Sequence, residues 1–288
     1  MKLAKRQALT GWALVLPLLM GCVLFYAVPF CMVAWFSGVN GSGYSREFAG
    51  FSNYKELLRN EIFRMAAGNT AAFLILGIGL NLLMAYGIAL LIKKQMAGSR
   101  LLQSVVMLPY VMPVVGTVLM ADIVFTETGL ANALLQRLGL PVADWLQSEM
   151  AFVMVLFLYL WKNTGYSVLL FLSGLATIPP EQYDAAELDG AKPRQKFCHI
   201  TAPQMWYSVF FAGVFSLLNA FKCFREIFLI GGTYPHESIY MLQHFINNCF
   251  EKLSYSKMAV ASMLMTATVS LLFILCYRWV NRKEAYKE

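Results

Sequence analysis

Six long apolar segments, separated by more polar ones, dominate the pattern of this chain. A helix that crosses a membrane needs about 20 mostly apolar residues, and each of the six segments reaches that length. Four of the segments contain no charged residue. The other two contain four in all: Lys162 in one, and Lys222, Arg225 and Glu226 in the other. The pattern predicts spans at 10–36, 69–92, 101–121, 150–178, 205–230 and 258–277.

Composition supports this interpretation. Of the 288 residues, 59% are hydrophobic and 14% are charged, against roughly 45–50% and about 25% in soluble domains. Too few charges remain to cover that much apolar surface in water, so lipid must solvate much of it. We therefore predict an all-α integral membrane protein in which residues 1–288 form a single transmembrane domain.

Basic residues predict the orientation in the bilayer. The formal net charge is +7, and one set of alternating connections carries thirteen Lys and Arg residues while the other carries seven. Because basic residues favour the cytoplasmic side, both termini are expected there, with the first span retained rather than cleaved as a signal peptide. No basic stripe with interleaved aromatic residues favours nucleic acid as a partner. The expected cytoplasmic connections are 1–9, 93–100, 179–204 and 278–288.

Two prolines interrupt the third predicted span. Pro109 and Pro113 each remove a backbone donor and kink a helix, which a membrane bundle tolerates where neighbouring groups satisfy the freed carbonyls. A kinked helix suits the lining of a solute path, and it also occurs in ordinary bundles. The sequence leaves both interpretations open.

The connection 179–204 is long and has internal order. Pro179, Pro180 and Glu181 are typical of a helix start, and Gly190 is typical of a helix end. A second short helix is expected over 193–200. Two short helices bent at a glycine form either a docking element for another protein or a cap on their own bundle.

The residues of this connection resemble a known motif. Asp184-Ala185-Ala186, then Gly190, Ile200 and Ala202-Pro203, match the spacing of the EAA loop of ABC importer permeases, in which the pattern is Glu-Ala-Ala, Gly, Ile and Leu-Pro. The fuller stretch is similar to the carbohydrate branch, the maltose- and glycerol-phosphate-type permeases. Asp184 replaces the family's glutamate with its charge kept, and Ala202 replaces leucine.

The resemblance implies the type I ABC importer permease fold in a bacterial or archaeal cytoplasmic membrane. It also implies partners: ABC ATPase subunits, a second and different permease subunit, and an extracytoplasmic solute-binding protein. The chain has no GxxxxGK[ST] loop, so we expect no cofactor or metal in it, no enzymatic activity, and ATP and Mg bound by the ATPase. The implied ATPase-coupling residues are Asp184, Ala185, Ala186, Asp189, Gly190 and Ala191.

Polar groups inside spans are costly and mark functional sites by default. Amides and aromatic rings are what a sugar needs for hydrogen bonds and flat apolar contacts. Alternatives remain open: the two asparagines could bond between helices, and Glu226 could pair with Lys222 at i, i+4 or with Lys162. Asn81 is expected to pack. The substrate-path candidates are Tyr159, Asn163, Tyr166, Asn219, Lys222 and Glu226.

Two other functions compete with the import of a sugar. ABC importers of polyamines, anions or amino acids also carry EAA loops, and a membrane scaffold or enzyme is a third possibility, although no catalytic constellation supports it. Between the last two spans, 238–253 has the spacing of an amphipathic helix. His236 and His244 are expected to be exposed loop residues there rather than metal ligands.

Overall fold

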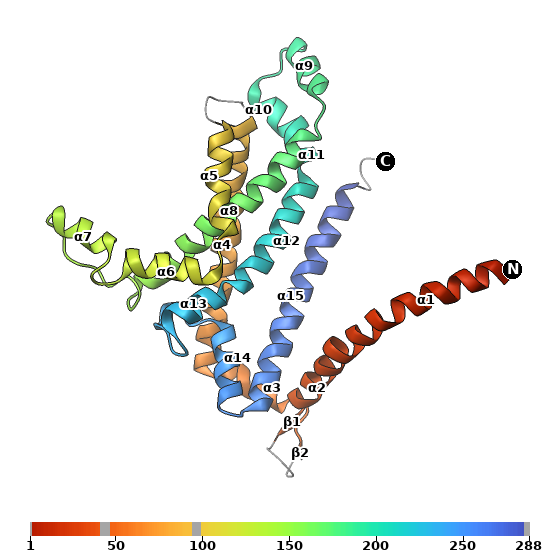
Figure 1. The fold of residues 1–288 in the computed structure, drawn as a ribbon, viewed down its shortest axis with the longest axis vertical. Helices are drawn as coiled ribbons and strands as arrows, with labels where there is room; N and C mark the ends of the chain where they lie inside the picture. Colours follow the sequence, from red (N-terminus) through yellow and green to blue (C-terminus); the bar gives the residue numbers. More distant parts are fainter. Residues whose placement is uncertain (1, 41–46, 94–98, 285–288) are drawn as a thin grey trace. The chain divides into compact units, whose positions relative to one another are not determined.

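The computed structural model describes residues 2–40, 47–93 and 99–284. The chain forms two compact units, one of residues 1–64 with 245–269 and the other of residues 65–244 with 270–288. Helices make up nearly all of the described structure (Figure 1). Six helices or helix pairs of the described part are long and apolar enough to cross a membrane. They are Gly11–Ser37, Glu61–Lys93, Val114–Arg137, Met150–Ala176, Trp206–Gly231 and Tyr255–Arg278.

The first unit begins with one long helix. α1 continues through one turn of π-helix, Val23–Ala27, into α2, and none of the most apolar stretch of this helix is buried. A short antiparallel ribbon follows, with Val39 paired to Phe48. The complete elements of this unit are α1 (Lys2–Cys22), α2 (Val28–Ser37), β1 (Val39–Asn40), β2 (Glu47–Phe48) and α3 (Ser52–Arg59). It also holds parts of α4 (Glu61–Lys93), α14 (Leu242–Glu251) and α15 (Tyr255–Glu284).

Leu253 ends α14 in an unusual backbone conformation. Its φ is 55°, the left-handed region that normally takes glycine at this position of a helix end. The pattern is a Schellman motif, because Leu253 N–H donates to Phe250 O at 2.9 Å and Ser254 N–H donates to Cys249 O at 2.8 Å. The leucine side chain is 63% exposed, so packing contributes little in return.

Leu253→Gly is expected to stabilise this helix end. Relief of the left-handed strain is worth about 1–2 kcal/mol, and the extra entropy that glycine loses on folding offsets about 0.5–1 kcal/mol of it. The net gain is on the order of 1 kcal/mol, measurable as slower amide hydrogen exchange at the end of α14. Leu253→Ala, which keeps the strain, is the control; equal exchange rates in both variants would contradict the strain argument.

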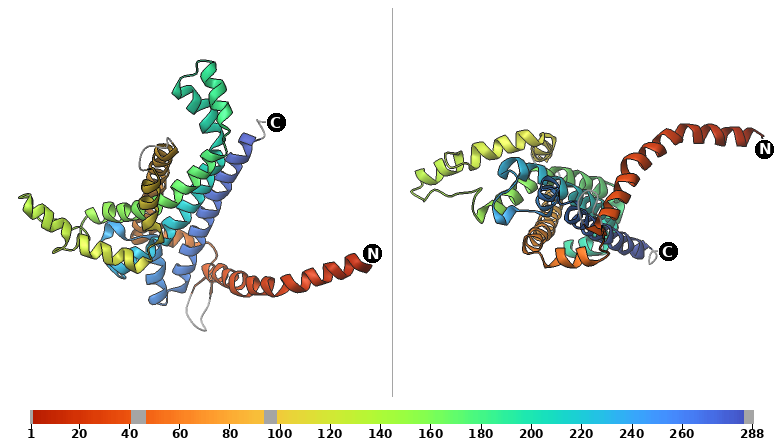
Figure 2. Two further views of the ribbon diagram at one scale, coloured as in Figure 1. Left: turned by 45° about the horizontal axis from the view of Figure 1, so that its top comes forward. Right: turned by 90° about the horizontal axis from the view of Figure 1, so that it is seen from below.

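The second unit contains the bundle that holds the site. Its complete elements are α5 (Ser99–Val111), α6 (Val114–Phe125), α7 (Leu130–Arg137), α8 (Met150–Ala176), α9 (Pro180–Leu188), α10 (Pro193–Lys196), α11 (Ala202–Gln204), α12 (Trp206–Lys222) and α13 (Phe224–Gly231). Phe197–Thr201 forms a π-helical turn, and Glu237–Ile239 forms a 3₁₀ turn. α8 packs against both α5 and α12, and Figure 2 shows the α9–α11 connection beyond the ends of α8 and α12.

The third predicted span is divided rather than kinked. α5 ends at Val111 and α6 begins at Val114, and the two helices run in different directions (Figure 1). Pro113 explains the break, because proline has no N–H and disfavours helical geometry at Met112 before it. The expectation of one helix over 101–121 was therefore wrong, and the long candidate span in this region is Val114–Arg137.

A buried polar cluster joins three helices of the bundle. Asn81 on α4 donates to Ser167 Oγ at 2.8 Å and to Ser216 Oγ at 2.7 Å, and Thr164 donates to Asn81 Oδ1 at 3.0 Å. Asn81 is fully buried. Such satisfied networks hold membrane helices together where apolar contacts alone are unselective, which confirms Asn81 as a packing residue.

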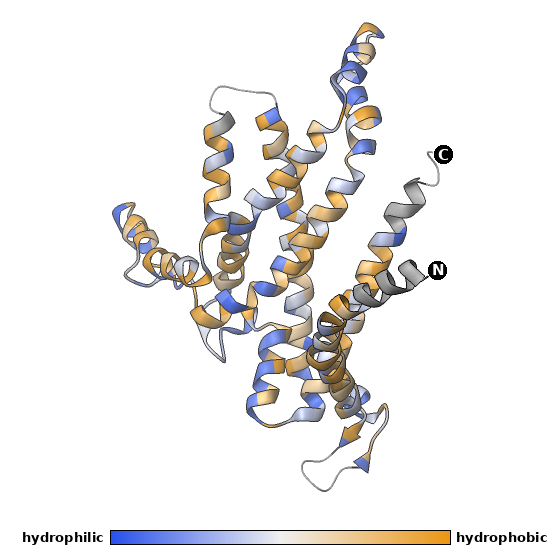
Figure 3. Ribbon diagram, turned by 45° about the vertical axis from the view of Figure 1, so that its right-hand side comes forward, coloured by the Kyte–Doolittle hydropathy of each residue, from blue (hydrophilic) through white to orange (hydrophobic). Residues whose placement is uncertain are grey.

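Apolar side chains cover much of the outer helix surfaces. In Figure 3 orange residues extend along the long helices, and blue residues are more frequent in the short connecting elements. Exposed large apolar residues occur on α1, α4, α6 and α15, with Leu18, Leu83, Ile123 and Leu275 as examples. In water this surface would be unstable, whereas in a bilayer it is solvated by lipid chains.

Candidate functional site

A cavity of about 240 Å³ lies among α8, α12, α13 and the break between α5 and α6. Every charged residue of the six predicted spans lines it: Lys162, Lys222, Arg225 and Glu226. These residues are up to 64 positions apart in the sequence. Their convergence on one wall is therefore a property of the fold, and it defines the candidate site.

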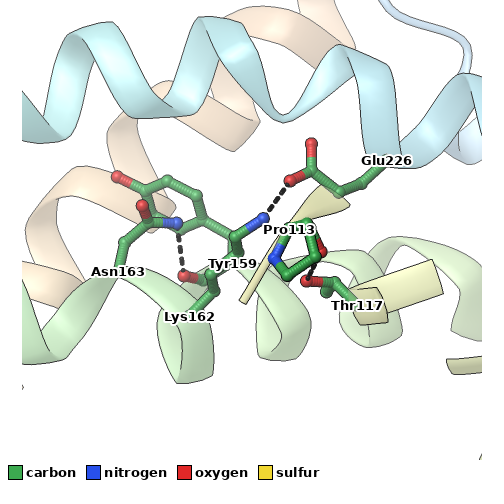
Figure 4. Close-up of polar contacts among 6 residues, drawn as sticks. All are labelled: Pro113, Thr117, Tyr159, Lys162, Asn163 and Glu226. Carbon is green, nitrogen blue, oxygen red and sulfur yellow. Dashed lines mark hydrogen bonds and ion pairs between the residues drawn. The ribbon is translucent and has the colours of Figure 1, made fainter. Parts of the chain in front are cut away.

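An ion pair crosses the cavity wall. Lys162 Nζ on α8 lies 2.7 Å from Glu226 Oε1 on α13, and the two side chains are 14% and 11% exposed. Figure 4 shows both side chains reaching toward each other. This confirms Lys162 as the partner of Glu226, and the alternative pairing of Glu226 with Lys222 was wrong. The helix turns between Lys222 and Glu226 are interrupted at Cys223, so the i, i+4 geometry of a continuous helix does not apply.

The remaining cations of the wall are not neutralised by the part of the chain that the structure describes. Within the described residues, neither Lys222 nor Arg225 forms an ion pair, and both are exposed. The second oxygen of Glu226, Oε2, is buried without a hydrogen-bond partner among those residues. Within the described residues, the cavity wall thus holds two cations without an ion pair and one buried acceptor without a hydrogen bond.

The predicted aromatic and amide residues divide into two groups. Tyr159, Asn163 and Asn219 line the cavity, whereas Tyr166 does not; its ring stacks on Tyr110, with 4.9 Å between centroids, and Tyr110 lines the cavity. Two of the polar groups are engaged within the bundle. Tyr159 Oη donates to Ser216 O at 2.9 Å. Asn163 Nδ2 donates to Tyr159 O at 2.9 Å, as Figure 4 shows.

Both helix interruptions of the bundle adjoin the cavity. Pro113, at the break between α5 and α6, and Cys223, between α12 and α13, line its wall. Thr117 donates to Pro113 O at 3.3 Å and so satisfies a carbonyl near the break (Figure 4). Interrupted helices at a charged cavity are typical of solute sites in membrane proteins. Of these two interruptions, the sequence indicated the one at Pro113 and gave no sign of the one at Cys223.

The connection 179–204 folds as two short helical pieces around Gly190. α9 ends at Leu188, and Gly190 has a φ of 76°. Gly190 N–H donates to Glu187 O at 3.0 Å and Ala191 N–H donates to Ala186 O at 2.9 Å, the hydrogen bonds of a Schellman motif. The predicted bend at Gly190 is confirmed, and so is the helical course of the residues after Pro193.

Polar contacts attach this connection to the bundle. Tyr183 Oη lies 2.9 Å from Thr201 Oγ1 and accepts from Lys93 Nζ at 3.4 Å. Lys196 forms an ion pair with Glu187 at 2.7 Å, and its ammonium group lowers the pKa of that carboxyl. The contacts within the connection give it a defined shape, and Lys93 of α4, which also donates to Leu175 O of α8 at 3.4 Å, links it to the ends of both helices.

The predicted coupling residues lie on the outer side of this connection. Asp184, Ala185, Asp189 and Gly190 are exposed, and Leu188 is 91% exposed. A single exposed apolar side chain is ordinary at a protein surface, so Leu188 is available for a contact but does not by itself identify a partner. The structure leaves the role of these residues a prediction.

His244 is a buried residue, contrary to the expectation of an exposed loop histidine. Its Nδ1 accepts from Met241 N–H at 3.1 Å, which caps the start of α14. Its ring packs edge-on against Phe224, with centroids 4.7 Å apart, and beside Tyr240. Burial lowers the pKa of His244 to about 4, so the ring is neutral at physiological pH.

Acid is expected to destabilise the start of α14 through His244. An unfolded histidine has a pKa of about 6.5, so between pH 6.5 and 4 the unfolded state takes up the proton first and the folded state loses stability as pH falls. The full loss is on the order of 3 kcal/mol and is reached below pH 4. Hydrogen exchange of the α14 amides measured from pH 7 to 5 checks this.

His244→Gln removes this titration and should flatten the pH dependence of exchange at α14. His236→Gln, which changes a half-buried histidine of the same connection, is the matched control and should leave the dependence unchanged. The same slope in His244→Gln as in the unaltered chain would contradict the assignment.

The fold and the site together define a class. The chain belongs to the family of binding-protein-dependent transport system inner membrane components, whose pattern matches residues 94–285. It is therefore a multi-pass protein of the inner membrane. The match includes α5 through α15, and with them the cavity and the loop around Gly190.

Named relatives cover nearly the whole chain. The sn-glycerol-3-phosphate transport system permease protein UgpA of Yersinia pestis is 31% identical over 281 residues, which cover 96% of this chain and 95% of UgpA. The trehalose/maltose transport system permease protein MalF of Thermococcus litoralis is 26% identical over 285 residues, which cover 98% of this chain and 96% of MalF. Both relatives are transport permeases rather than enzymes.

A solved structure has the same fold. A chain of a bacterial ABC transporter involved in the import of the acidic polysaccharide alginate superposes with a TM-score of 0.81, over 98% of this chain and 99% of that one. At 21% identity this likeness shows the fold alone. The prediction of an ABC importer permease fold is confirmed; the orientation of the termini and the single-domain prediction stay predictions.

Proposed function

We propose that this chain is the transmembrane subunit of an ATP-driven importer and forms the translocation path for a carbohydrate delivered by an extracytoplasmic binding protein. The observation that carries the proposal is the convergence of all charged residues of the predicted spans on one cavity. Charges at bilayer depth are costly and mark substrate paths. The family membership and the transport systems named for UgpA and MalF support a carbohydrate or polyol as the solute.

The size of the cavity supports a shared path. About 240 Å³ is below the ~300–1,000 Å³ of a typical complete ligand site. A second permease facing this wall would supply the rest, as expected for a heterodimer. Among the competing solutes, polyamines fit poorly because Lys222 and Arg225 would repel a cation.

The connection around Gly190 would meet the ATPase. Its rigid bend, its contacts to α4 and α8, and the exposed Asp184 and Leu188 support docking in a partner rather than capping of its own bundle. ATP and Mg would then be bound by that partner, and both termini would lie in the cytoplasm. Closing of the ATPase would be transmitted through Tyr183 and Lys93 to the bundle.

The test is isolation of the tagged chain from its native membrane in mild detergent, followed by mass spectrometry and reconstitution. Recovery of a nucleotide-binding ATPase and a second six-span chain, with ATP-dependent carbohydrate uptake into proteoliposomes once the binding protein is added, is the expected result. Recovery of the chain alone, under conditions that preserve other importers, would overturn the proposal and favour a scaffold.

A further inference from the structure

The charges of the cavity wall do not balance. Of the 23 Lys and Arg residues in the chain, the three that fall within the six predicted spans are Lys162, Lys222 and Arg225, and all three line this cavity. Glu226 is the one carboxylate of those spans and lines it too. With side chains in their ordinary charge states, three cations face one anion, and the wall carries two excess positive charges.

The geometry assigns the excess to particular residues. Glu226 neutralises Lys162 at 2.7 Å, which leaves Lys222 and Arg225 without an ion pair in the described part of the chain. Lys222 ends α12 and Arg225 lies in the first turn of α13, so both flank the interruption at Cys223. Ionised groups at a cavity wall without a counter-charge favour an anion entering the cavity.

The wall also offers an acceptor. Glu226 is 8% exposed and lines the cavity, and its buried Oε2 has no hydrogen-bond partner among the described residues, so a ligand reaches this oxygen when the carboxylate turns toward the cavity. An oxygen of an ionised carboxylate accepts hydrogen bonds and donates none, so its natural partner in a ligand is a hydroxyl group. Two cations and an acceptor on one wall match a molecule that carries both an anionic group and hydroxyls.

We propose that the solute is an anionic carbohydrate, with a carboxylate or phosphate group beside its hydroxyls, that Lys222 and Arg225 bind the anionic group, and that Glu226 Oε2 accepts a hydroxyl. The arginine fork suits the two oxygens of a carboxylate or phosphate, and the lysine adds a point charge. This inference rests on the proposed function, because it names the solute of the same path.

The experiment uses the whole importer with its binding protein in proteoliposomes. Thermal shift of the binding protein with neutral sugars, hexuronates, uronate oligomers and sugar phosphates selects the probe, and the expected hit is one of the anionic classes. Uptake of that probe should fall about tenfold to a hundredfold in Lys222→Gln and in Arg225→Gln, the loss expected for a charge-assisted hydrogen bond. Arg225→Lys should fall less, since it keeps the charge.

Arg137→Gln, which removes a basic residue of α7 outside the cavity, is the matched control and should transport normally. Selection of a neutral sugar, carried equally well by Lys222→Gln and Arg225→Gln, would overturn the inference and leave the proposed function standing. Loss of the second permease from the purified variants would also overturn it, because the cations would then belong to the interface. Failure of the unaltered importer to carry any carbohydrate would instead refute the proposed function.

Discussion

Gly190→Val is expected to abolish most transport while leaving the chain folded and assembled. Gly190 has a φ of 76°, and a side chain there would meet no atom within 4 Å, so the substitution strains the backbone without a clash. The strain is about 1–2 kcal/mol or more for a β-branched residue, well below the ~5–15 kcal/mol that keeps a domain folded. The equilibrium constant for the bent form of the loop would fall roughly 5–30-fold.

The measurement compares uptake with ATP hydrolysis in the reconstituted importer. Uptake should fall by up to the same 5–30-fold, with ATP hydrolysis no longer stimulated by the loaded binding protein. Uptake at the unaltered rate would refute the role of this loop in coupling.

Gly139→Val provides a closely matched control. Gly139 has a φ of 73°, also with no atom within 4 Å of an added Cβ, and it ends α7 with the same pair of hydrogen bonds: Gly139 N–H to Gln136 O and Leu140 N–H to Leu135 O. The backbone penalty is therefore the same. An equal loss of uptake in both variants would mean that local strain, rather than contact with the ATPase, is responsible.

Lys162→Met is expected to cost about 3–5 kcal/mol of stability, because it leaves the Glu226 carboxylate buried without its partner. The double substitution Lys162→Met with Glu226→Leu removes both charges and should recover most of that loss. Apparent melting temperatures of the detergent-solubilised complex, taken at one scan rate because membrane complexes unfold irreversibly, separate the two variants.

An exposed ion pair of the same chain is the control. Lys257 Nζ lies 3.3 Å from Glu56 Oε1, with side chains 49% and 65% exposed. Lys257→Met should change stability by no more than about 1 kcal/mol. If Lys162→Met lowers the melting temperature no more than Lys257→Met does, water reaches the Lys162–Glu226 pair freely. The argument that Glu226 would be left buried without a partner then fails.

The sequence predicted the features that depend on local chemistry. Runs of about 20 apolar residues can scarcely do anything but span a membrane, and a glycine after a short helix favours its left-handed end, as found at Gly190. Lys162 was one of two predicted partners of Glu226, because a buried charge needs an opposite one and Glu226 is the one acid within the spans predicted from the sequence.

Features that depend on packing were missed or assigned incorrectly. Tyr166 follows Tyr159 and Asn163 at helical spacing, yet seven residues advance a helix by nearly two turns, which moves the side chain beyond the cavity to Tyr110.

His244 looked like a surface residue because histidine is polar. Its bond to Met241 N–H, three residues earlier, is the reach-back contact of a capping box, and that spacing could have indicated it.

The Asn81 cluster has a mechanical consequence. One asparagine bonded to side chains of α8 and α12 at 2.7–3.0 Å fixes the register of three helices, since a slide of one turn would break all three bonds. α4, α8 and α12 should therefore move as a rigid body. The flexible points are then the interruptions at Pro113 and Cys223, both in the cavity wall. Rotation at these two interruptions would widen or narrow the cavity directly. A small displacement of the rigid body of α4, α8 and α12 would therefore change access to the charged wall.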